Sequence, residues 1–163
     1  MNPAQPNPIH KILLTTDGSI TTILEAITGK QIKVETVEQK IIQADKETAQ
    51  QLNIEQGDEV NYRVVNLKAG EDIVAHAVSH TPLKRLKEDF REDLMKADLP
   101  IGNIINKHQL EVRREINWGR IEPADSLTIF DEDRILSRNY SIIHNGDILI
   151  NITEYFPYTI NKA

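Results

Sequence analysis

Three charged residues, Arg63, Arg138 and Glu154, fall where the hydrophobic alternation of their own segments predicts a buried side chain. Glu154 follows three isoleucines at alternate positions of the segment 148–156, and Arg138 stands among apolar alternate positions of the segment 135–144. Arg63 also shares one face of its segment with apolar residues. Burying a charge is costly unless another group pairs with it, so these three side chains indicate an internal polar site.

The chemistry that these residue types favour is the binding of a small anion. Two arginines against one carboxylate leave excess positive charge, and the planar guanidinium grips a carboxylate with two hydrogen bonds. A carboxylate in an apolar site, such as Glu154, suits a proton acceptor because desolvation raises its basicity, whereas Arg138 nearby acts in the opposite direction. A buried ion pair that serves only the fold is the alternative interpretation of Arg138 and Glu154.

The last two segments flank His144-Asn145-Gly146 and predict a β-hairpin. A three-residue loop with Gly146 in a left-handed bulge position pairs Ile142 with Ile148 and places Arg138 opposite Ile152. Arg138 is then diagonal to Glu154 on the same face. A two-residue turn would place Arg138 on the opposite face, so the hydrophobic pattern favours the three-residue loop.

Periodicity and capping residues predict the elements that must position these side chains. The predicted helices are 19–28, 45–52, 82–94 with Pro82 at its first position, and 100–108. The predicted strands are 32–42 with a bulge at Val37, 59–67, 73–80, 110–116, 135–143 and 148–156. Hairpin-joined strands with helices in their connections predict an α+β fold on a mainly antiparallel sheet.

Composition narrows the class of protein. The chain has 163 residues, a formal net charge of −6 and no cysteine. The acidic balance and scattered basic residues argue against nucleic-acid and anionic-lipid partners, and the missing cysteines exclude thiol and zinc-thiolate chemistry. His76 and His80 are four residues apart on a predicted strand, roughly 13 Å, so no metal site is expected. We expect a cytoplasmic protein with a flexible N-terminal arm at 1–8, one domain over 9–163, and no membrane segment.

The sequence resembles the chorismate pyruvate-lyase family, including its archaeal and bacterial branch of small lyase-like proteins. The resemblance covers most of the chain in the family's order, and the opening Leu-Thr-Thr-Asp-Gly, the early arginine and the Thr-Glu-x-Phe-Pro ending are together its specific part. The matching stretches are 13–21 with Leu24-Glu25, 62–67, 99–102, 118–120, 138–140 and 152–157.

The resemblance implies an antiparallel sheet with helices and flap-like helical segments over a buried ligand, and a lyase that converts chorismate to 4-hydroxybenzoate and pyruvate without metal or cofactor. By position, Arg63 would hold the ring carboxylate, with help from the backbone amides of Ile20 and Ile101. Glu154 would face the hydroxyl or ether oxygen, and Arg138 would bind the enolpyruvyl carboxylate. Ile20 replaces a methionine of the best-known enzymes.

A non-catalytic sensor domain of the same fold is the alternative function, as in the effector domains of certain transcription regulators. A structural or interaction protein with a buried ion pair is a third. The sequence leaves the oligomeric state open.

Overall fold

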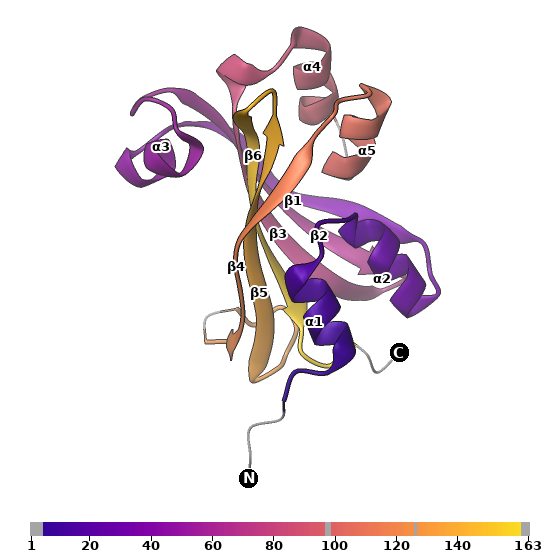
Figure 1. Ribbon diagram of the computed structural model, residues 1–163. Helices are drawn as coiled ribbons and strands as arrows, with labels where there is room; N and C mark the ends of the chain where they lie inside the picture. Colours follow the sequence, from indigo (N-terminus) through magenta and orange to yellow (C-terminus); the bar gives the residue numbers. More distant parts are fainter. Residues whose placement is uncertain (1–4, 97–98, 126, 161–163) are drawn as a thin grey trace.

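Six antiparallel strands form one twisted sheet in the computed structural model (Figure 1), which describes residues 5–96, 99–125 and 127–160. The spatial order is β1-β2-β3-β6-β5-β4, so two three-stranded meanders join through β3 and β6. The strands are β1 (Ile32–Gln43), β2 (Glu59–Ala69), β3 (Asp72–Pro82), β4 (Arg113–Pro123), β5 (Arg134–His144) and β6 (Asp147–Pro157). The predicted α+β class with an antiparallel sheet is confirmed.

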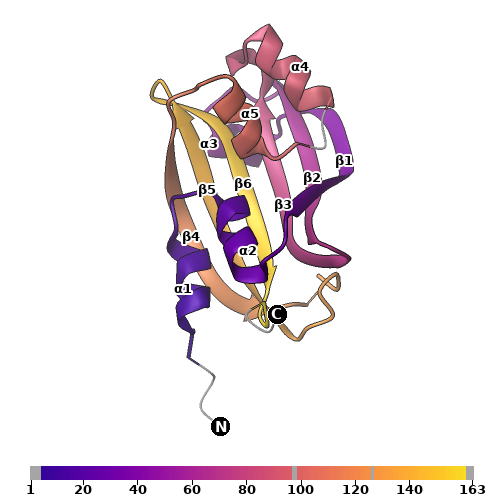
Figure 2. The same cartoon turned by 90° about the vertical axis from the view of Figure 1, so that its right-hand side faces the viewer.

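Helices cover mainly one face of this sheet, where α1, α2, α4 and α5 lie in front of the strands in Figure 2. Their bounds are α1 (Pro8–Thr15), α2 (Ile20–Thr28), α4 (Glu88–Lys96) and α5 (Ile101–Lys107). The short α3 (Lys46–Leu52) packs near the end of the sheet against Val60 and Ile148. Ser19 caps α2, Asp45 caps α3, and Gly29 ends α2 with a positive φ of 68°, which agrees with the predicted bounds of these two helices.

The first helix was not predicted, because Pro8 was assigned to an N-terminal arm. Pro8 instead stands at the first helical position, where its missing N–H costs nothing, and Asn7 caps the helix through His10. The His10 ring also bonds the backbone oxygen of Tyr158 at 2.7 Å, which fastens α1 to the chain after β6. Residues 1–4 of the predicted arm lie outside the described residues.

Two element boundaries were predicted wrongly. Pro82 does not open a helix: it ends β3 opposite Val60, a 3₁₀ turn η1 (Leu83–Arg85) follows, and α4 begins at Glu88. A proline fits the end of a strand as well as the start of a helix. Strand β4 begins at Arg113 and runs to Pro123, well past the predicted end, because the bulge between Ile116 and Trp118 interrupts its alternation.

The hairpin of β5 and β6 forms, but its predicted register is wrong. The turn has two residues, Asn145 and Gly146, with φ of 52° and 79°, which suits a type I′ turn. A bulge between Ile142 and Ile143 then shifts the pairing by one residue, so that Arg138 lies directly opposite Glu154. Arg138 and Glu154 therefore share one face, as predicted, but the bulge and not a three-residue turn places them there.

Two apolar clusters fill the space between the sheet and its helices. The first packs α1 and α2 on β2, β3, β5 and β6, and includes Leu13, Leu24 and Phe156. The second packs α4 and α5 on β3, β5 and β6, and includes Phe90, Ile104 and Ile152. Both clusters contact the half-buried Val65, so they meet over the centre of the sheet.

Candidate functional site

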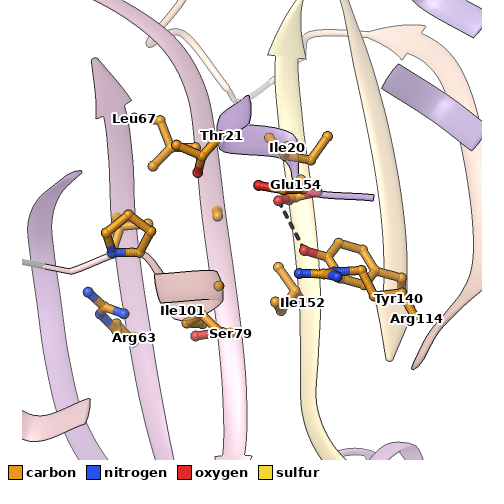
Figure 3. A pocket seen from close by; sticks show the side chains of 15 residues that line it. Ile20, Thr21, Arg63, Leu67, Ser79, Ile101, Arg114, Tyr140, Ile152 and Glu154 are labelled. Atoms are coloured by element: carbon orange, nitrogen blue, oxygen red, sulfur yellow. Dashed lines mark hydrogen bonds between the residues drawn. The ribbon is translucent and has the colours of Figure 1, made fainter. Parts of the chain in front are cut away.

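A small, partly open cavity of about 70 Å³ lies between the two helix pairs, over the central strands. Figure 3 shows Arg63 on one side of the cavity and Glu154, Tyr140 and Arg114 on the other. Apolar side chains fill most of the wall between them, among them Leu67, Ala77 and Ile152. A small apolar space with a few converging polar groups is the usual form of a small-molecule site.

Strand register explains why residues far apart in sequence meet here. Arg63 on β2 pairs with Ser79 on β3, Ser79 with Ile152 on β6, and Ile152 with Tyr140 on β5. All four therefore lie in one row across the sheet and on the same face. At about 4.8 Å per strand, the backbones of Arg63 and Tyr140 are roughly 14 Å apart, so their side chains line the cavity from opposite sides.

Glu154 lines the cavity from β6 and is 5% exposed. Its Oε1 accepts a hydrogen bond from Nε of Arg138 at 2.8 Å, and its Oε2 accepts one from the Tyr140 hydroxyl at 3.3 Å. The carboxylate is thus held from one side by a cation and from the other by a neutral donor. This arrangement fixes its orientation toward the cavity.

Arg138 is fully buried behind Glu154 and does not line the cavity. Besides Glu154, its guanidinium contacts the backbone oxygen of Thr16 through Nη1 at 2.7 Å and lies over the Tyr140 ring, 4.6 Å from the centroid. Its Nη2 has no hydrogen-bond partner among the described residues. The structure therefore brings Arg138 to the site as the partner of Glu154 and as a support for the loop between α1 and α2.

Arg63 is 2% exposed and lines the opposite side of the cavity. Its Nη2 donates to the backbone oxygen of Leu99 at 2.9 Å, just before α5. Ile20 and Ile101, the two predicted backbone donors, both border the cavity as the first residues of α2 and α5. First-turn amides have no acceptor within their own helix, so their N–H groups are suited to an incoming anion.

Among the cavity residues that the sequence did not identify, Arg114 is the charged one. Arg114 on β4 lines the cavity beside Tyr140, although it is not among the candidate site residues derived from the sequence. Arg114 alternates instead with Val112 and Ile116, so it is a fourth charge on an apolar face. The pattern that identified Arg63 and Arg138 also identifies Arg114 once the even positions of this segment are considered.

The described ranges contain no cluster of three or more histidine, cysteine, aspartate or glutamate residues arranged for a metal ion. No helix within these ranges is long and apolar enough to cross a membrane.

The Tyr140 hydroxyl provides a pH-dependent test of this geometry. Burial, followed by the negative charge of Glu154, raises the pKa of Tyr140 well above its usual value, while Arg138 and Arg114 act against this shift. The folded pKa of Tyr140 lies above the unfolded value of about 10. The contribution of the protonated Tyr140 hydroxyl to the free energy of unfolding is therefore fully present below about pH 10 and is lost as the pH rises through the folded pKa.

We therefore expect one tyrosine to stay protonated in the folded chain at a pH where it ionises in the unfolded chain. Tyrosinate absorbance measured for wild type and Tyr140→Phe checks this. Near pH 10.5 the two folded proteins should match, and the two unfolded proteins should differ by about three quarters of a tyrosinate. A wild type that shows an extra tyrosinate when folded would place Tyr140 in contact with solvent.

The same α+β fold occurs in solved structures of other proteins. The effector domain of PhnF from Mycobacterium smegmatis has the same fold, with a TM-score of 0.67 and 16% identity over 88% of this chain and 90% of that one. The gene product SA0254 from Staphylococcus aureus subsp. aureus N315 is also similar, with a TM-score of 0.64 and 12% identity over 89% and 90% of the two chains. At these identities the likeness concerns the fold.

Sequence comparison identifies the family. The family described as "Chorismate pyruvate-lyase Rv2949c-like" matches residues 14–163, and the chain belongs to it. A protein of Methanocaldococcus jannaschii named "Putative lyase MJ0807" is 41% identical over 156 residues, which are 90% of this chain and 77% of that protein. The resemblance noted from the sequence is thereby confirmed.

Proposed function

We propose that the chain is a chorismate pyruvate-lyase that releases 4-hydroxybenzoate and pyruvate from chorismate. The observation that carries the proposal is the cavity itself, in which an arginine and an oriented carboxylate face each other across an apolar wall. Family membership and the lyase name of the relative from Methanocaldococcus jannaschii support this reaction class.

The elimination needs little from the protein, because it converts the ring to an aromatic one. The bond between ring carbon and ether oxygen breaks, the adjacent ring carbon loses its proton, and that C–H pair completes the aromatic ring. The leaving enolpyruvate keeps the ether electrons, gains one proton at its methylene carbon and becomes pyruvate. Positioning and charge stabilisation therefore supply the rate enhancement.

Each polar group has a proposed task. Arg63 holds the ring carboxylate, with the backbone amides of Ile20 and Ile101 as further donors. Glu154, which Arg138 and Tyr140 hold in place, accepts the ring proton. Arg138 is therefore proposed as a positioning residue, since its side chain is enclosed behind Glu154 rather than facing the cavity.

Incubation with chorismate tests the reaction directly. We expect 4-hydroxybenzoate and pyruvate to appear in equal amounts, with or without a metal chelator. An Arg63→Met variant should bind 4-hydroxybenzoate about 10- to 100-fold more weakly, because the ligand carboxylate loses a charged donor. Calorimetric titration measures this loss, and Arg113→Met, which removes an exposed arginine, is the control.

Product formation no faster than the spontaneous reaction would reject the lyase. An Arg63→Met variant that binds as tightly as wild type would reject the role of Arg63, and an Arg63→Lys variant guards against a folding defect by keeping the charge.

A ligand-binding sensor is the second candidate. It is favoured by an effector domain and a transcriptional regulator among the similar structures, which share the fold at low identity. Binding of 4-hydroxybenzoate without turnover of chorismate would select this function over the first.

A further inference from the structure

A second guanidinium borders the cavity beside the Glu154 end. Arg114 is half-buried on β4 and pairs with Ile142 of β5, so Tyr140 is its diagonal neighbour on the same face. Figure 3 shows its guanidinium alongside Tyr140, across the cavity from Arg63. No hydrogen bond or ion pair joins Arg114 to another residue within the part of the chain that the structure describes.

Arg114 also marks the boundary between the cavity and an outer groove between α2, β1 and α5. Five residues line both spaces: Ser19, Thr21, Pro100, Gly102 and Arg114. A β-carbon added to Gly102 would lie 3.8 Å from Nη2 of Arg114, so the arginine extends under the start of α5. A ligand group that points from the ring toward the opening must pass this guanidinium.

We propose that Arg114 is the specificity-determining residue that binds the second carboxylate of a dianionic ligand. On the proposed function, on which this inference rests, that group is the enolpyruvyl carboxylate. Arg138 is enclosed and paired with Glu154, so Arg114 is the arginine at this end that reaches the cavity. Its fork of N–H donors matches a carboxylate that enters from the groove.

The placement agrees with the shape of chorismate. Its ether side arm is attached next to the ring hydroxyl and away from the ring carboxylate. With the ring carboxylate at Arg63 and the hydroxyl end at Glu154, the side arm lies next to Tyr140 and Arg114. A ligand that lacks the second carboxylate, such as 4-hydroxybenzoate, makes no use of Arg114.

Binding of two matched probes tests this inference without turnover. The dianion 3-(carboxymethoxy)benzoate and the monoanion 3-methoxybenzoate differ by one carboxylate on the side arm. Wild type should bind the dianion about 10- to 100-fold more tightly in calorimetric titrations, since a charged hydrogen bond is gained. In Arg114→Met this preference should fall to about twofold or less, and Arg114→Lys should keep part of it.

Arg113→Met is the matched control, because it removes the same charge from the neighbouring residue on the solvent side of β4. It should keep the wild-type preference for the dianion and the wild-type affinity for 4-hydroxybenzoate. A dianion preference that survives in Arg114→Met, or that wild type lacks, overturns the inference. A wild type that prefers the dianion but does not turn over chorismate rejects the proposed function alone.

Discussion

Replacing Glu154 by glutamine is expected to lower kcat for chorismate by about 10²- to 10⁴-fold, the usual contribution of one general base. Glutamine has nearly the same volume, and its amide oxygen can still accept a hydrogen bond from Nε of Arg138. The cavity should therefore keep its shape while losing the group that accepts the ring proton. Steady-state formation of 4-hydroxybenzoate, followed by absorbance, measures the effect.

Two controls separate chemistry from binding in this variant. Glu115→Gln changes an exposed glutamate that pairs with Arg113, and it should keep wild-type turnover. Glu154→Gln should still bind 4-hydroxybenzoate, since Arg63 on the other side of the cavity is unchanged. Full turnover by Glu154→Gln would remove the proposed catalytic role even if the chain is a lyase.

The common face of Arg138 and Glu154 was predictable from sequence, but their direct pairing was not. Alternation assigned each side chain to the buried face, and the register then depended on the turn and on a bulge between Ile142 and Ile143. A bulge leaves no clear signature when both faces of the strand are apolar. Of the eleven residues of β5, nine are buried, so its pattern does not reveal a one-residue shift.

The secondary structure around two prolines was also ambiguous in the sequence. Pro8 and Pro82 are each compatible with a helix start and with extended chain, and the structure assigns them opposite to the prediction. The capping residue decides between the two: Asn7 precedes Pro8 and accepts a bond from His10, whereas Pro82 pairs with Val60 in the sheet. This pairing is long-range, so local sequence does not contain it.

The lining of the cavity could not be predicted from the sequence, because it depends on the order of the strands in the sheet, which no local pattern provides. Ser79 and Ile152 face each other only because β3 and β6 join the two meanders. Arg63 and Glu154 were identified from their own strands, but they line one cavity only because β3 and β6 are neighbours. Arg114 was within reach of the same argument and was missed because the odd positions of its strand were charged.

Replacing Arg138 by methionine is expected to destabilise the fold by about 3–5 kcal/mol, because it leaves the Glu154 charge buried without its cation. The variant also removes the bond to the Thr16 backbone oxygen, which holds the loop between α1 and α2 near the cavity. Urea unfolding measures the loss. By contrast, Arg120→Met on the exposed stretch of β4 should change stability by less than about 1 kcal/mol.

The double variant Arg138→Met/Glu154→Met distinguishes a buried charge from lost packing. Removing both partners leaves no uncompensated charge, so stability should recover most of the way toward wild type, while turnover should be at least as low as in Glu154→Gln. If the double variant is as unstable as Arg138→Met alone, the bond to Thr16 and the contact with the Tyr140 ring dominate instead. If Glu154 is catalytic and Arg138 orients it, the double variant should be stable but inactive, and Glu154→Gln should also lose turnover. If the pair serves only the fold, Glu154→Gln should keep wild-type turnover.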